Sequence, residues 1–138
     1  MARSIMAPGT MGSAPRDVEG TVLIIDDDAG MLDLLVTLLE AHGFWVLTAS
    51  SGVRALQVIR ESAPRVVLTD ILMPGQDGIE IIREVRRVHL DVKIIAMSGG
   101  GRINKLDLLR YAHLLGADAT INKPADIDEL IGLLRSFL

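Results

Sequence analysis

This sequence predicts an α/β domain built on a parallel sheet, and two observations support that fold class. After Thr21, short apolar runs rich in β-branched residues alternate five times with segments of helical spacing. Polar side chains follow several of these runs, at the strand ends where an open α/β sheet forms its ligand crevice. The predicted strands are 21–25, 44–49, 66–69, 92–97 and 119–121.

The first helix is predicted between the first two strands. Its apolar positions follow the spacing i, i+3, i+4, i+7 and i+8, which gives a helix one apolar face. Asp28 can cap the start of this helix, and Gly43 is a typical residue after a helix end. The apolar positions are Met31, Leu34, Leu35, Leu38 and Leu39.

Four more helices are predicted in the remaining connections and at the C-terminus. Pro64 and Gly116 end the second and fourth. Right-handed crossovers then favour a flavodoxin-like, doubly wound sheet of five strands in the order 2-1-3-4-5 with five helices. The apolar helix positions are Ala55, Leu56 and Ile59; Ile79, Ile82 and Val85; Leu106, Leu109 and 112–115; and Ile127, Leu130, Ile131, Leu134 and Leu138.

Residues 1–19 differ from the rest and are expected to be a flexible leader or a cloning remnant, with the folded domain at 20–138. The leader contains prolines and glycines but no periodic pattern. It also lacks the continuous apolar stretch of a signal peptide. Because no output domain follows Leu138, we expect a single-domain protein or a domain excised from a longer one.

The composition restricts the function classes. The 138 residues carry a formal net charge of −4, which argues against nonspecific nucleic-acid binding. The absence of cysteine excludes disulfides, thiol catalysis and thiolate zinc sites. No apolar stretch approaches the roughly 20 residues that a membrane-spanning helix needs. We therefore expect a cytoplasmic protein without a membrane or nucleic-acid partner.

Four strand ends carry a chemically complementary set of side chains. Asp26, Asp27 and Asp28 follow the first strand, Asp70 the third, Ser98 the fourth and Lys123 the fifth. Individually, these residues are ordinary turn formers, loop hydroxyls or solvated cations. Together they offer oxygen ligands for a hard cation such as Mg²⁺, a carboxylate nucleophile, a hydroxyl donor and an ammonium. Those are the parts that phosphoryl transfer needs.

The same residues lie in segments that resemble the receiver domains of bacterial two-component response regulators. The similarity runs from about Val22 to the C-terminus, and the segment after the third strand is its most specific part. The segments are Ile25-Asp26-Asp27-Asp28, Asp70-Ile71-Leu72-Met73-Pro74-Gly75-Gln76-Asp77-Gly78, Met97-Ser98-Gly99 and Lys123-Pro124.

The resemblance implies a role for each site residue. Asp70 would be the phosphoacceptor, and Ser98 and Lys123 would bind the phosphoryl group. Mg²⁺ would be held by the carboxylates of Asp27 and Asp70 and the backbone carbonyl of Leu72, with Asp26 binding directly or through water. Ser98 would also turn toward the phosphoryl group as part of the switch. The residues implied to shape the surrounding loops are Pro74, Gly78 and Pro124.

The resemblance also implies partners. A histidine kinase or a histidine phosphotransfer protein would donate the phosphoryl group, and a downstream protein would bind the fourth helix, fifth strand and fifth helix. The chain would be a monomer or weak dimer. It would catalyse only its own phosphorylation and dephosphorylation.

Three features depart from the usual pattern of these domains. Thr120 stands where the family usually has the aromatic ring that moves with the switch hydroxyl, so the usual coupling is in doubt. Three glycines, Gly99 to Gly101, follow Ser98 and predict a mobile loop. Leu72, an apolar residue where a polar one is common, would slow hydrolysis of an aspartyl phosphate.

Two alternative functions compete with this interpretation. A phosphohydrolase of the haloacid-dehalogenase type needs Asp-x-Asp-x-Thr/Val after the first strand, and the residues after Ile25 do not supply it. A docking module or phosphate sink without a conformational output stays open because of Thr120.

Overall fold

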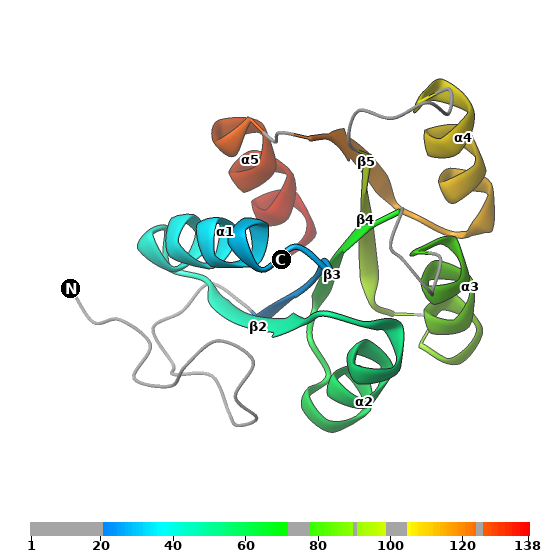
Figure 1. The fold of residues 1–138 in the computed structure, drawn as a ribbon, viewed down its shortest axis with the longest axis horizontal. Helices are drawn as coiled ribbons and strands as arrows, with labels where there is room; N and C mark the ends of the chain where they lie inside the picture. The colour runs from blue at the N-terminus through cyan, green and yellow to red at the C-terminus, as the bar shows by residue number, and fades with distance from the viewer. Residues whose placement is uncertain (1–20, 72–77, 90, 99–104, 124–125) are drawn as a thin grey trace.

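The computed structural model describes residues 21–71, 78–89, 91–98, 105–123 and 126–138. Five parallel strands form one sheet in the order β2-β1-β3-β4-β5, which confirms the predicted order (Figure 1). The strands are β1 (Thr21–Ile25), β2 (Trp45–Ala49), β3 (Val66–Asp70), β4 (Lys93–Ser98) and β5 (Ala119–Asn122).

Two of the strands extend one residue beyond their apolar runs, and the added residues are the polar ones that were predicted to end them. The third and fourth strands continue through a polar residue, because Asp70 stands opposite Met97 and Ser98 stands opposite Asn122 in the ladder. Asp70 and Ser98 are therefore the last residues of β3 and β4 and not the first residues of loops. The ladder holds their backbone in a fixed extended form.

Helices cover both faces of the sheet, as predicted for a doubly wound fold. The first and last helices cover one face, and the other three cover the opposite face (Figure 1). None of the helices that the structure describes is both long enough and apolar enough to cross a membrane. The helices are α1 (Ala29–Ala41), α2 (Gly52–Ser62), α3 (Gly78–Val88), α4 (Lys105–Leu115) and α5 (Ile127–Phe137).

Alternate side chains of the strands enter two separate cores. In β1, Leu23 and Ile25 pack toward α2 and α3, whereas Val22 and Ile24 pack toward α1 and α5. All four are fully buried, which explains why the strand reads as an uninterrupted apolar run. Burial of each such side chain contributes roughly 1.5–3 kcal/mol, so the sheet is a rigid frame for the residues at its ends.

The helix caps bring α1 close to the acidic cluster. The side chain of Asp28 accepts hydrogen bonds from the backbone N–H groups of Gly30 and Met31, which confirms it as the N-cap of α1. Gly43, with a φ of 94°, follows the end of the same helix, as expected. Because the carboxylate of Asp28 is used in this cap, Asp28 does not belong to the group of carboxylates that could hold a metal ion.

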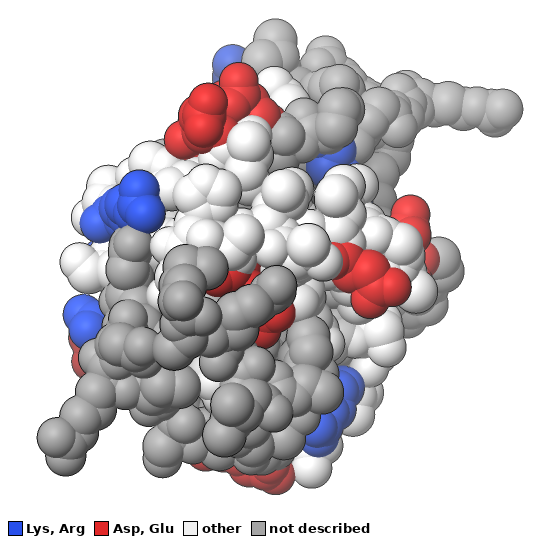
Figure 2. Space-filling model, turned by 90° about the vertical axis from the view of Figure 1, so that its left-hand side faces the viewer, with Lys and Arg blue, Asp and Glu red and all other residues white. Residues whose placement is uncertain are grey.

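Charged side chains are dispersed over the face of the molecule in Figure 2. The Lys and Arg side chains of the described residues stand apart from one another there, and no continuous basic surface forms in that view. This distribution agrees with the net charge of −4.

Candidate functional site

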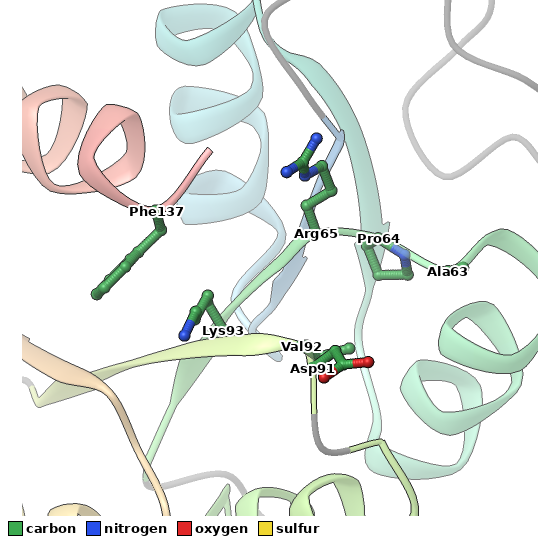
Figure 3. A pocket seen from close by; sticks show the side chains of 7 residues that line it. All are labelled: Ala63, Pro64, Arg65, Asp91, Val92, Lys93 and Phe137. Atoms are coloured by element: carbon green, nitrogen blue, oxygen red, sulfur yellow. The ribbon is translucent and has the colours of Figure 1, made fainter.

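The predicted site residues gather at the carboxyl edge of the sheet. Asp26 and Asp27 follow β1, Asp70 ends β3, Ser98 ends β4 and Lys123 follows β5. A cavity of about 370 Å³ lies at the opposite edge, where β3 and β4 begin (Figure 3). It shares no residue with the predicted site, so the acidic edge and the cavity are separate features.

Lys123 forms hydrogen bonds to a carboxylate at the end of the first strand and to one at the end of the third. Its Nζ donates to Asp26 Oδ2 at 2.6 Å and to Asp70 Oδ2 at 3.1 Å. The three side chains are only 15%, 0% and 10% exposed. Burial opposes the charged form of Lys123, but hydrogen bonds and charge from Asp26 and Asp70 outweigh it, so its pKa lies above the ordinary value. Asp26 and Asp70 therefore favour the charged form of Lys123 at this edge.

Asp26 and Asp27 have different surroundings although they are neighbours in the chain. Asp26 is fully buried, with Oδ2 bound to Lys123 and Oδ1 accepting the backbone N–H of Asp28 at 3.0 Å. Asp27 is exposed. A buried charge needs such partners, whereas an exposed carboxylate can exchange water for another ligand. Asp26 is thus fixed in place, and Asp27 faces solvent.

Three carboxylates are close enough together to share one cation. Asp26, Asp27 and Asp70 each offer an oxygen, and these oxygens all lie within 4.8 Å of one another. An all-oxygen set with water at the remaining positions suits Mg²⁺, which prefers carboxylates and keeps several waters. The residues present therefore fit this ion. The predicted fourth ligand, Leu72, lies outside the described residues, as does Pro74.

Gly78 lies directly against the backbone of the candidate phosphoacceptor. Its N–H donates to the carbonyl of Ile71 at 2.8 Å, and the N–H of Ile71 donates to the carbonyl of Met97 at 2.9 Å. A Cβ at position 78 would overlap the carbonyl oxygen of Asp70 and lie 2.7 Å from Ile71 Cα. Only glycine fits this close approach. Ile71, which sequence reasoning passed over, thus fixes Asp70 from both β4 and α3, and its apolar character gave no signal of this.

Ser98 and Lys123 are joined through the backbone. The N–H of Lys123 donates to the carbonyl of Ser98 at 2.8 Å, directly after the paired residues Ser98 and Asn122. Ser98 is 1% exposed. The two residues predicted to bind a phosphoryl group are therefore adjacent and anchored to the same ladder. Gly99 to Gly101 and Pro124 lie outside the described residues.

Thr120 stands beside another small residue. It is half-buried in β5, opposite the fully buried Ala96 of β4. Its neighbours Ala119 and Ile121 pack toward α1 and α5, so alternation places Thr120 on the face that α4 covers. No aromatic ring occupies position 120, as the sequence already shows.

The order of the strands and the acidic group at their carboxyl ends define the class of this protein. It is a doubly wound, flavodoxin-like α/β protein, a class that binds ligands at the carboxyl ends of its strands. The family model described as "Response regulator receiver domain" matches residues 22–135. The chain belongs to this family, whose members are phosphoacceptors in two-component signalling.

Curated relatives agree with that assignment. Sporulation initiation phosphotransferase F of Bacillus subtilis is 32% identical over 117 residues, covering 85% of this chain and 92% of the relative. The transcriptional regulatory protein CpxR homolog of Haemophilus influenzae is 40% identical over 118 residues, covering 85% of this chain and 49% of the relative. The chain thus spans about half the length of that regulator.

Solved structures show the same fold. A response regulator receiver domain protein from Clostridium thermocellum superimposes with a TM-score of 0.79 at 32% identity, covering 85% of this chain and 92% of the other. A CheY-like receiver domain protein from Methanospirillum hungatei superimposes with a TM-score of 0.78 at 27% identity, covering 85% of this chain and 91% of the other.

Proposed function

We propose that this chain takes a phosphoryl group from a histidine kinase or a histidine phosphotransfer protein onto Asp70, with Mg²⁺, and then changes the surface that it presents to a protein partner. One observation carries the proposal. Asp70 belongs to the only group of described residues in which three acidic side chains could hold a metal ion, and it is also hydrogen-bonded to Lys123.

The proposed reaction is a direct transfer. A carboxylate oxygen of Asp70 attacks the phosphorus of a phosphohistidine. A new O–P bond forms, the P–N bond breaks, and the imidazole nitrogen keeps the electron pair and takes up a proton. Asp70 can act this way because it ends the central strand, with its backbone held by β4 and Gly78. The chain then acts only on its own phosphoryl group and is not an enzyme for other substrates.

The charges of the site support a divalent cation. Three carboxylates face one ammonium, which leaves two negative charges at this edge. When bound by Asp27, Asp70 and Asp26, Mg²⁺ supplies positive charge toward the oxygens of the transferred group. Lys123 supplies a compact cation on the side of Asp26, and Ser98 supplies a hydroxyl at the end of β4.

The proposed partner surface is formed by α4, β5 and α5. Two large apolar side chains of α4, Tyr111 and Leu114, are 54% and 79% exposed. Exposed apolar groups of this size favour contact with a protein over contact with a nucleic acid. We propose a cytoplasmic protein that is a monomer or weak dimer and has no nucleic-acid or membrane partner.

A receiver-like docking module or phosphate sink without a conformational output is the second candidate. Thr120 favours it, because this small side chain, which is paired with the small Ala96, stands where an aromatic ring usually takes part in the switch. Under this candidate Asp70 accepts phosphate, but the α4 surface does not respond.

Phosphorylation by a small acyl phosphate tests the proposal. With Mg²⁺, the wild-type chain should form an acid-stable, base-labile adduct on Asp70, and Asp70→Asn should lose it. Asp91→Asn is the matched control, because Asp91 is an exposed acid at the opposite edge of the sheet. Incorporation into Asp70→Asn at the wild-type rate would show that Asp70 is not the acceptor.

A further inference from the structure

The C-terminal end of α4 is tied to α3 and β4 by one side chain. Arg86, in the last turn of α3, donates from Nε and Nη2 to the carbonyl of Gly116 at 3.1 and 2.8 Å. Its Nη1 donates to the carbonyl of Val92 at 2.9 Å. A planar guanidinium that reaches acceptors on two sides fixes their relative positions. We call this contact, with Asp118, the Arg86 clamp.

Asp118 completes the Arg86 clamp. Its Oδ2 accepts from Arg86 Nη2 at 2.8 Å and from the backbone N–H of Ile94 at 2.8 Å. The N–H of Asp118 in turn donates to the carbonyl of Ile94 at 2.7 Å. The two charged side chains are 22% and 28% exposed, so water screens them only in part. The segment between α4 and β5 is thereby bound to the start of β4.

Gly116 brings the clamp close to the backbone. Its φ of 123° is a conformation that favours glycine, and a Cβ there would lie 2.9 Å from Arg86 Cγ. It also ends α4, because its N–H donates to the carbonyl of His113 and the N–H of Ala117 donates to that of Ala112. The end of α4 and the guanidinium therefore form one packed unit.

The two ends of α4 lie at opposite edges of the sheet. In a parallel α/β unit the helix runs back against the strands, so the start of α4 is at the carboxyl edge with Ser98. Its end, with Gly116, is at the amino edge in the Arg86 clamp. The start of α4 therefore shares the carboxyl edge with Asp70, while three charge-assisted hydrogen bonds from Arg86 to Gly116 and Asp118 hold its end. A fourth ties Arg86 to the carbonyl of Val92.

We propose that the Arg86 clamp is a fixed pivot for α4. This inference rests on the proposed function, because it concerns how phosphorylation of Asp70 moves that helix. The start of α4 changes position, and residues 112–118 stay in place. The clamp persists in both states. Releasing its hydrogen bonds would cost free energy, and the coupling free energy of a switch of this kind is too small to supply it. Arg86 is a positioning residue and touches no reacting group.

Hydrogen exchange on the full chain tests the pivot. Beryllium fluoride with Mg²⁺ serves as the phosphoryl mimic, and peptides covering 105–109 and 112–118 are compared. In the wild type, the mimic should slow exchange at 105–109 by about fivefold and leave 112–118 unchanged. In Arg86→Met, the effect should extend to 112–118. Arg87→Met should behave as wild type, since the described partner of the Arg87 side chain is Glu84 on its own helix.

A milder pair of variants keeps the test decisive if Arg86→Met does not fold. Arg86→Lys retains the charge but loses the planar fork, and Asp118→Asn retains the shape but loses the charge. Each should extend the response into 112–118. Equal responses at 105–109 and 112–118 in the wild type, or a wild-type profile in all three variants, would overturn the pivot.

The same data separate failure of the pivot from failure of the proposed function. Binding of the mimic at Asp70 is read from slower exchange around 26–28 and 70. If these segments do not respond, the proposed phosphoacceptor site fails and the pivot fails with it. If they respond and the pattern along α4 differs from the one above, only the pivot is overturned.

Discussion

The two edges of the sheet differ in how their charged side chains are arranged. At the carboxyl edge, acidic groups are concentrated against one another, and the buried polar residues of the described chain all lie there: Asp26, Thr69, Asp70 and Ser98. At the amino edge, the Arg86 clamp pairs its charges one to one and satisfies them with backbone carbonyls. The carboxyl edge therefore carries more negative than positive charge, whereas the charges of the Arg86 clamp are paired and hold α3, the end of α4 and the start of β4 together.

This contrast explains why the site needs so rigid a support. Carboxylates that repel one another would separate if their backbone were free to move. The parallel ladder and Gly78 prevent this at Asp70, and Lys123 prevents it at Asp26. Backbone hydrogen bonds, close packing and one ammonium thus hold the carboxylates together in spite of their mutual repulsion.

The largest effect is expected from Gly78→Ala. The new methyl group would overlap the carbonyl of Asp70, so the free energy of unfolding should fall by about 3 kcal/mol, and phosphorylation should be lost. Gly132→Ala is the matched control: nothing lies within 4 Å of its added Cβ, and alanine in a helix should raise stability by about 0.5–1 kcal/mol. Urea unfolding measures both. Equal effects of the two variants would contradict the close packing at Gly78.

Lys123→Met should have the next largest effect. It leaves the fully buried Asp26 without its cation, and the free energy of unfolding should fall by about 2 kcal/mol in the absence of Mg²⁺. Saturating Mg²⁺ should restore part of the loss, because it neutralises the same carboxylates. Lys93→Met, an exposed cation at the amino edge, should change stability by less than about 0.5 kcal/mol. Urea unfolding with and without Mg²⁺ decides this, and no rescue by Mg²⁺ would count against a shared cation site.

Much of this arrangement could be predicted from the sequence. Alternating runs and helical spacing predicted the sheet order, and the strand ends predicted which side chains would meet. The different burial of Asp26 and Asp27 could not be predicted, because adjacent residues of one acidic run gave no sign of which faces inward. The Arg86 clamp could not be predicted either, since its contacts to Gly116 and Asp118 span 30 and 32 residues. Side-chain contacts over such separations leave no periodic trace in a sequence.

Asp27→Ala should separate ion binding from stability. Loss of one of three oxygen ligands should weaken Mg²⁺ binding at least about tenfold and reduce phosphorylation with it. Stability without Mg²⁺ should be unchanged or higher, because the substitution removes charge repulsion from an exposed position. Calorimetry measures the affinity, with Asp91→Ala as the control at the opposite edge. Unchanged affinity in Asp27→Ala would remove Asp27 from the ligand set.

The smallest effect is expected where the carboxyl edge meets the proposed partner surface. With a phosphoryl mimic and Mg²⁺, hydrogen exchange should slow within 103–115 at the start of that segment, while residues 112–115 and α2 should change little. We expect a coupling free energy of about 1 kcal/mol, because Thr120 offers no ring to carry the change and α4 would have to carry it alone. Thr120→Val keeps the size and removes only the hydroxyl, so it should leave the response intact. A response confined to 26–28 and 70, with none in α4, would favour the phosphate sink or passive docking module, because the acidic edge would then be isolated from the surface it was proposed to control.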